Sequence, residues 1–349
     1  MSFGCSVVLL CLGCTALAAC GNGDRGEMPS ASNLLGLVLS GGAAKGAYEV
    51  GVWQELQTAG LAAHITAISG TSIGAINAAL FATNPESVER IWRENMKDVF
   101  AVNKKAVGRD LQELMNTASN SVEIARETGD SRKAWAHFIL SAAAQAGSRY
   151  AGATHGDVDS EGYIDSAHLA KALNANIPLR WPDNTPAVYA TALVKGGENE
   201  ITTWRLNSES HERRILMLRA SAALPGAFDT IRIDGKVYID GGWERRGGDN
   251  IPLRPILDNH PDIKTVIVVY LLDEEHLNHD RRAKNREAAV AKGVRLVEII
   301  PTKDISGKFG LGGLVDTRSE TARDLVDLGR KDAEKVLKRE GLWSKMNHQ

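Results

Sequence analysis

A serine between two glycines is the first feature of the sequence that could do chemistry. Gly70 and Gly74 flank Ser72 in a G-x-S-x-G pattern, between an expected strand over residues 65–69 and an expected apolar helix from residue 75. Such glycines permit a sharp strand-to-helix turn that presents a nucleophilic hydroxyl. The spacing also arises by chance in a chain with 34 glycines, so a tight turn with a helix-capping serine is the alternative.

A second glycine-rich turn lies nearer the N-terminus. Gly41, Gly42 and Ala43 stand between an apolar run over residues 34–39 and a helical pattern over residues 46–58. The backbone N–H groups of such a junction form a site for an anion. The spacing matches neither the P-loop nor the dinucleotide-binding fingerprint. An oxyanion hole beside a nucleophile accounts for both turns together.

An aspartate followed by two glycines is the third candidate. Asp240 comes directly after an expected strand over residues 236–239, and Gly241 and Gly242 open the backbone behind it. A carboxylate in this position could take the proton of an attacking serine hydroxyl. By itself, however, an Asp-Gly-Gly segment is simply a turn.

Taken in order, the three segments resemble the patatin-like phospholipase family, whose pattern is a glycine-rich loop, a G-x-S-x-G serine and an Asp-Gly-Gly acid. The likeness includes the neighbouring residues 46–52, 220–228 and 250–253, and it covers residues 34 to 273. Four ordered blocks make the resemblance specific.

The resemblance implies a role for each matched residue. Ser72 would be the nucleophile of a serine acyl hydrolase, and Asp240 would be the base of a catalytic dyad. Gly41, Gly42 and Ala43 would supply the N–H groups of the oxyanion hole. The reaction would pass through an acyl-enzyme without a metal or an organic cofactor, and its substrates would be phospholipids or other lipid esters.

Three further features lie near this expected site: Ala43, Lys45 and residues 243–249. Ala43 stands where the family has a third glycine, so its N–H can serve only if the backbone there accepts a side chain. Lys45 stands where the family has Arg or Lys, and it could orient the loop or be a solvated surface charge. Residues 243–249 form an insertion after the Asp-Gly-Gly segment, and we expect it to affect the acyl or headgroup pocket.

The order of elements predicts an α/β fold. Strand, loop and helix occur twice between residues 34 and 83, which is typical of a parallel sheet covered by helices. Further strands are expected over residues 187–194, 201–206, 231–233, 236–239, 265–272 and 294–300, and an amphipathic helix over 317–338. We therefore expect a three-layer α/β/α domain with a central, mostly parallel sheet over residues 34–349, carrying a helical insert or partial lid over 100–155.

The composition excludes one class of partner. The 349 residues carry a formal net charge of −2, with 43% hydrophobic and 24% charged residues, and no long run of Lys and Arg. Binding to nucleic acid requires a clustered cationic face, so we expect no nucleic-acid partner. The sequence does not indicate an oligomeric state.

The N-terminal segment indicates export. All four cysteines lie there, at Cys5, Cys11, Cys14 and Cys20. Residues 1–19 resemble a secretory signal, and the segment ending at Cys20 resembles a bacterial lipoprotein lipobox. We expect cleavage before Cys20, its lipidation, and a flexible tether over residues 20–33. The expected location is the bacterial cell envelope, with the outer membrane favoured because Gly21 follows the cysteine. A cleaved soluble signal or a disordered start is the alternative.

Other readings of the motifs stay open. A Ser-His-Asp α/β-hydrolase would need a downstream histidine. The histidines after Asp240 are His260, His276, His279 and His348, and none lies at the end of an expected strand. A non-catalytic lipid-binding envelope protein is a further alternative. Residues 157–168 have part of an EF-hand pattern, but His168 replaces the final Glu, which favours an acidic surface turn over a calcium site.

Overall fold

The computed structural model describes residues 34–94, 99, 164, 166–196, 200–225, 227–244, 247–305 and 319–343. The expected signal peptide (1–19), Cys20, the tether (20–33) and the expected insert over 100–155 lie outside the described residues. So do the acidic positions of the EF-hand-like segment.

The described residues form one eight-stranded sheet that is mostly parallel. Its strands are β1 (Leu35–Leu39), β2 (Ile65–Thr71), β3 (Ala187–Val194), β4 (Ile201–Arg205), β5 (Ile231–Ile233), β6 (Lys236–Asp240), β7 (Thr265–Val269) and β8 (Arg295–Ile299). They lie in the order β5-β6-β3-β2-β1-β7-β8, and β4 also pairs with β3. The five strands from β3 to β8 in this order are parallel, whereas β4, β5 and β6 pair antiparallel with their neighbours.

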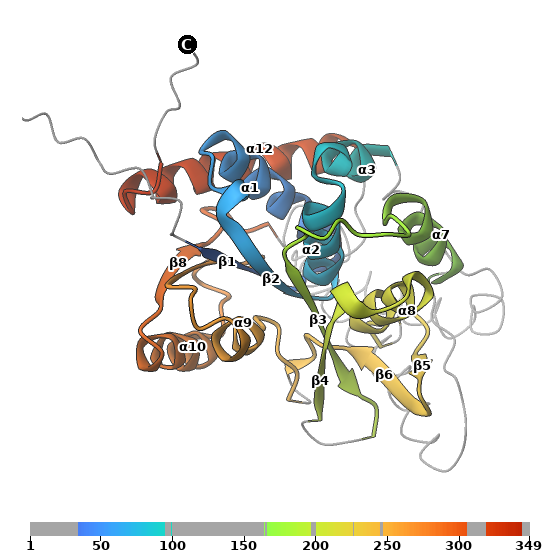
Figure 1. Cartoon of the computed structure of the whole chain (residues 1–349). Coiled ribbons are helices and arrows are strands. Elements are labelled where there is room, and N and C mark those ends of the chain that lie inside the picture. The colour runs from blue at the N-terminus through green and yellow to red at the C-terminus, as the bar shows by residue number, and fades with distance from the viewer. Residues whose placement is uncertain are drawn as a thin grey trace, which may run out of the picture.

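Helices cover both faces of the sheet (Figure 1). They are α1 (Ala47–Thr58), α2 (Ile73–Thr83), α3 (Val88–Glu94), α7 (Ser166–Asn176), α8 (His211–Ser221), α9 (Arg254–Asn259), α10 (His279–Ala291) and α12 (Ser319–Arg339). Alternation along β1 shows the two faces: Leu37 and Leu39 pack in the cluster that includes α1, α2, α8 and α12, whereas Val38 packs with α9 and α10. The predicted three-layer α/β/α architecture is therefore confirmed.

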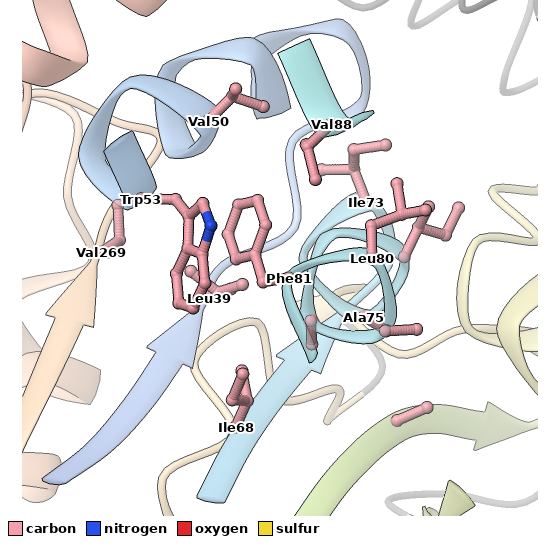
Figure 2. Close-up of a cluster of buried hydrophobic side chains, with 14 of the residues drawn as sticks. Leu39, Val50, Trp53, Ile68, Ile73, Ala75, Leu80, Phe81, Val88 and Val269 are labelled. Atoms are coloured by element: carbon pink, nitrogen blue, oxygen red, sulfur yellow. The ribbon is translucent and has the colours of Figure 1, made fainter. Parts of the chain in front are cut away.

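The larger core lies between the sheet and helices α1 and α2. Figure 2 shows Trp53 of α1 and Phe81 of α2 above the ends of β1 and β2. Their rings stack with centroids 4.7 Å apart and planes 8° from parallel. Leu39 and Ile68 pack in the same buried cluster. This packing holds α2, the helix that directly follows Ser72, against α1 and the sheet.

The C-terminal helix α12 lies very close to α1, because glycines face the partner backbone on both helices. A Cβ atom added to Gly51 would lie 2.0 Å from the carbonyl oxygen of Val326, and one added to Gly329 would lie 2.1 Å from that of Tyr48. The hydroxyl of Tyr48 also donates a hydrogen bond to Asp332 of α12 at 3.1 Å. The described helices include none that is both long and apolar enough to span a bilayer.

Several element boundaries differ from the predicted ones by one to three residues. The clearest difference is in β2, which continues past Ser69 to Thr71, because Gly70 pairs with both Leu39 and Ala190. The Asp234-Gly235 hairpin is confirmed, with φ angles of 48° and 80° that a two-residue turn of this kind needs.

Candidate active site

The register of β3 brings the candidate nucleophile and the candidate base together. Thr71, the last residue of β2, pairs with Thr191 of β3. The next residue of β3, Ala192, pairs with Asp240, the last residue of β6. Ser72 and Asp240 therefore leave the sheet at the same level on the two sides of β3, although 168 positions separate them in the chain.

Ser72 sits at a strained turn between β2 and α2. Its backbone has φ 57° and ψ −126°, a region that residues with a side chain rarely adopt. The flanking glycines are needed for space: a Cβ atom at Gly70 would lie 2.3 Å from the backbone of Gly74, and one at Gly74 would lie 2.5 Å from the carbonyl oxygen of Leu39. The Ser72 side chain makes no capping hydrogen bond to α2, which argues against the simple capping alternative.

Asp240 is a buried acid next to Ser72. It is 5% exposed, and its Oδ1 accepts a hydrogen bond from the N–H of Gly242 at 2.7 Å. Burial raises the pKa of Asp240 to about 6, and hydrogen bonds from the Ser72 side chain and from Gly242 oppose that rise. The carboxyl group is thus placed to take a proton from the Ser72 hydroxyl, and its pKa suits proton transfer near neutral pH.

The two glycines after Asp240 allow the backbone to pack closely. A Cβ atom at Gly241 would lie 2.3 Å from the carbonyl oxygen of Thr191, and one at Gly242 would lie 2.5 Å from Oδ1 of Asn250. No residue with a side chain would fit at either position without moving its neighbours.

The glycine-rich loop packs directly against Ser72. A Cβ atom added to Gly41 would lie 3.1 Å from the Cβ of Ser72. The N–H of Gly41 donates to Oδ1 of Asn250 at 3.0 Å, so this donor is already occupied. Within the described part of the chain, the N–H groups of Gly42 and Ala43 have no hydrogen-bond partner, which makes them the available donors for an oxyanion.

Ala43 adopts the left-handed conformation that favours glycine. Its φ is 50°, whereas Gly42 is extended with φ 172°. The backbone therefore accepts the side chain of Ala43 and keeps its N–H at the turn, at the cost of local strain. This explains why a glycine suits the same position in the family pattern.

Lys45 is buried, so the interpretation of this residue as a solvated surface charge is wrong. Its exposed fraction is 7%, and its Cε would lie 3.2 Å from a Cβ atom at Gly42. Burial lowers the pKa of Lys45 to about 8, and the carboxylates of Asp304 and Asp273 oppose that change. Lys45 thus lies behind the glycine-rich loop with two acidic groups in reach of its charge.

The same two aspartates and His276 form a group whose possible ligand atoms lie within 4.8 Å of one another. His276 interacts with Asp273 through Nδ1, and this interaction raises the pKa of His276. The negative charges of both carboxylates also act on Lys45, where they raise the pKa of its ammonium group. The charges of this group are already balanced by protein cations, so its residues do not fit a metal site well.

The candidate histidines do not join the site in the described structure. Nε2 of His260 lies 3.0 Å from the hydroxyl of Tyr189, and burial lowers the pKa of His260. His276 interacts with Asp273, and His279 begins α10. His348 lies outside the described residues. None of the three described rings is hydrogen-bonded to Ser72 or Asp240.

The sequence did not predict three contacts of the site. The N–H of Ser72 donates to Oγ of Ser221 at 2.9 Å. The side chain of Thr71 donates to the carbonyl oxygen of Asp249 at 2.7 Å. The amide oxygen of Asn250 accepts the hydrogen bond from the N–H of Gly41. Ser221 and Asn250 lie in blocks that resemble the family, but the resemblance assigned them no role.

The insertion after the acid folds back on the acid loop. The N–H of Asp249 donates to the carbonyl oxygen of Gly241 at 2.7 Å, and the N–H of Gly248 donates to that of Trp243 at 3.1 Å. Arg281 of α10 donates to the carbonyl oxygen of Gly248 at 2.6 Å. The described part of the insertion is therefore a closed turn, fastened to α10 beside the candidate site.

Three solved structures resemble the chain over most of its length. VipD from Legionella pneumophila is 14% identical over 88% of this chain and 67% of its own, with a TM-score of 0.41. ExoU in complex with SpcU from Pseudomonas aeruginosa is 15% identical over 87% and 53%, with a TM-score of 0.36. Human GIVD cytosolic phospholipase A2 is 10% identical over 91% and 61%, with a TM-score of 0.45. The chain thus spans between about half and two thirds of the length of these proteins.

Sequence comparison gives a more direct assignment. No protein with a curated description has significant sequence similarity to the chain. The family model described as patatin-like phospholipase matches residues 37–261, which is more than half of the 349 residues. The match includes the glycine-rich loop, Ser72 and Asp240. The chain belongs to the patatin-like phospholipase family.

Proposed function

We propose that the protein is a serine acyl hydrolase that cleaves lipid esters, phospholipids among them, through a Ser72–Asp240 dyad. The observation that carries the proposal is the position of Ser72 beside the buried Asp240 carboxylate, across β3 from it, where the Ser72 side chain lowers the pKa of that carboxyl. The strained turn at Ser72 and the unoccupied N–H groups of Gly42 and Ala43 support it.

In the proposed reaction, Asp240 accepts the proton of Ser72 as its Oγ attacks the ester carbonyl carbon. The tetrahedral oxyanion is stabilised by the N–H groups of Gly42 and Ala43, each worth about 2.7–4 kcal/mol in comparable sites. The intermediate then collapses to an acyl-enzyme, and Asp240 returns the proton to the leaving alcohol. Asp240 next takes a proton from a water molecule as that water attacks the acyl-enzyme, and it gives this proton to Ser72 Oγ when the second tetrahedral intermediate collapses and releases the fatty acid.

We also propose that the mature protein is attached to a bacterial membrane, the outer membrane by preference, through lipidated Cys20. The lipobox-like segment supports this, and attachment at a membrane face suits a lipid substrate. Labelling with a radioactive fatty acid would test it, since wild type should take up label and Cys20→Ser should not.

The experiment for the dyad compares wild type with Ser72→Ala and Asp240→Asn on a short-chain p-nitrophenyl ester and on mixed phospholipid vesicles. Both variants should lose hydrolysis, and mass spectrometry of the lipid products identifies the bond that wild type cleaves. Alanine variants of the four downstream histidines are the controls, and each should keep its activity. Loss of activity in one folded histidine variant, with Asp240→Asn still active, would favour a Ser-His-Asp triad.

A fluorophosphonate probe separates the enzyme from a non-catalytic lipid-binding protein. The probe should label wild type and leave Ser72→Ala unlabelled. Well-folded wild-type protein that takes up no probe would contradict the proposed hydrolase.

A further inference from the structure

Ser221 is a buried serine at the end of α8, and no role has been assigned to it. It is 0% exposed, so it cannot contact a substrate in this structure. Its position is 149 residues after Ser72 and 19 before Asp240. Nevertheless, its contacts involve both halves of the proposed dyad.

The Ser221 hydroxyl connects the Ser72 turn to the central strand β3. Its Oγ accepts a hydrogen bond from the N–H of Ser72 at 2.9 Å and lies 2.6 Å from the carbonyl oxygen of Thr191. A hydroxyl has one proton, and a carbonyl oxygen can only accept, so the proton of Ser221 is directed to Thr191. The oxygen of Ser221 is thereby left as the acceptor for the Ser72 N–H.

The backbone around Ser221 holds the acid in the same way. The N–H of Gly241 donates to the carbonyl oxygen of Ser221 at 3.4 Å, and the N–H of Asp240 donates to that of Ala223 at 2.9 Å. The short segment from Ser221 to Ala223, at the C-terminal end of α8, therefore contacts the backbone of Ser72 and also the backbone of Asp240.

The conformation of Ser72 explains why such a contact matters. A residue with φ 57° and ψ −126° keeps that backbone only where its surroundings enforce it. The carbonyl group of Ser72 is held by the N–H groups of Ala75 and Ile76, at 3.0 and 3.3 Å. Its N–H is held by Ser221, the one side chain in the described structure that bonds to the Ser72 backbone. Without the Ser221 hydroxyl, the buried N–H of Ser72 would have no acceptor. Because such an N–H is costly, the turn would tend to rotate until the N–H found another partner.

We propose that Ser221 is a positioning residue that fixes the Ser72 peptide so that the Ser72 hydroxyl faces Asp240. The inference rests on the proposed function of the Ser72–Asp240 pair. It also implies that the Ser72 N–H takes no part in the oxyanion hole, because Ser221 occupies it.

The kinetic test uses the full chain with Ser221→Ala. We expect kcat for ester hydrolysis to fall by about 100-fold, as small displacements of reacting groups do in other enzymes, while KM changes little because Ser221 does not contact substrate. Ser221→Thr, which keeps the hydroxyl, should recover activity. Ser221→Cys, with a weaker acceptor of similar shape, should not.

Ser69→Ala is the matched control. Ser69 is also 0% exposed and lies three residues before Ser72, but its hydroxyl has no hydrogen-bond partner within the described residues. We expect this variant to keep the kcat of wild type. An equal loss of kcat in Ser69→Ala and Ser221→Ala would overturn the inference, since it would show general sensitivity of the core.

Hydrogen exchange at the Ser72 amide provides a readout that does not depend on catalysis. The amide should exchange slowly in wild type and faster in Ser221→Ala. Faster exchange with an unchanged kcat would overturn the positioning role. If Ser221→Ala does not fold, the decision rests on Ser221→Thr and Ser221→Cys, and equal kcat values in these two would overturn it. Wild type that neither hydrolyses esters nor takes up a fluorophosphonate would refute the proposed function instead, and faster exchange at Ser72 in Ser221→Ala than in wild type would still show that Ser221 holds the turn.

Discussion

Asp240 lies beside Ser72 across strand β3, and no basic residue is among the groups that shift its pKa. In a Ser-His-Asp triad, the acid orients a histidine and stabilises its positive charge. In this chain, the proposed base lies beside the proposed nucleophile itself. The proton-accepting group of the proposed reaction is therefore a buried carboxylate, and its ionisation sets both the activity and part of the stability.

The first prediction concerns the pH dependence of activity. Asp240 must be ionised to accept the proton of Ser72, and burial raises its pKa to about 6. We expect kcat/KM to be low below this pH and to rise through a single ionisation near 6, since kcat/KM reports the free enzyme. A pH profile with a soluble p-nitrophenyl ester measures it. A profile that stays flat through this region, with the fold intact, would contradict the assignment.

The second prediction concerns stability. Ionisation of Asp240, which the proposed activity requires, should lower the stability of the folded chain. The pKa of Asp240 is about 6 in the folded chain, against an ordinary value of 3.8 for an aspartate. Folding therefore favours the protonated form of Asp240. The stability that this protonation contributes is lost as the pH rises from 3.8 to about 6. Above that pH the buried charge costs roughly 3 kcal/mol.

Asp240→Asn should thus be inactive but more stable than wild type at pH 7, and the difference should shrink below about pH 4, where Asp240 is protonated in both states. Thermal unfolding at the two pH values measures it, with Ser72→Ala as an inactive control. Equal stability of Asp240→Asn and wild type at both pH values would show that the carboxylate carries no such cost.

The sequence predicted the parts of the site that depend on local pattern. Glycine spacing indicated the turn at Ser72, and short apolar runs and turn residues indicated the strands β2 and β6, although Thr71 and Asp240 lie just beyond the bounds expected for these strands. The antiparallel edge was also predictable, because Asp234-Gly235 specifies a tight hairpin. The adjacency of Ser72 and Asp240 came only from the family resemblance, since it depends on the insertion of β3 between β2 and β6.

Other features could not be predicted, because they depend on contacts between distant segments. Ser221 lies 149 residues from Ser72, and Asn250 lies 209 from Gly41, so neither hydrogen bond has a local signal. A lysine is usually exposed. Lys45 is buried because it lies under its own loop and faces Asp273 and Asp304, which follow the neighbouring strands β7 and β8.

The third prediction concerns strain at the glycine-rich loop. Ala43 has φ 50°, which costs a residue with a Cβ about 1–2 kcal/mol. Ala43→Gly removes this strain. It also makes the unfolded chain more flexible, and this added conformational entropy stabilises the unfolded state by about 0.4–1 kcal/mol. We expect the variant to be equally or slightly more stable in urea unfolding, with its hydrolytic activity kept, because its N–H remains.

Ala283→Gly is the matched control for that change. Ala283 lies in the middle of α10 and is exposed, so the same replacement there should cost roughly 0.5–1 kcal/mol. The change in the free energy of unfolding should therefore differ between the two variants, either in sign or clearly in size. Equal destabilisation by both would show that Ala43 is not strained.

The fourth prediction tests the close contact between α1 and α12, which lies partly outside the family match. In an ordinary helix, Gly→Ala stabilises by up to about 1 kcal/mol, because alanine has the higher helix propensity. At Gly329 we expect the reverse, because the added Cβ would lie 2.1 Å from the carbonyl oxygen of Tyr48, a backbone atom that cannot rotate away. The two helices would have to separate, at a cost typical of overpacking, about 1–3 kcal/mol. Urea unfolding of Gly329→Ala measures the sign directly. A more stable variant would mean that α12 can move away from α1 without loss, and that its packing is not needed to hold the core shared by α1 and α2.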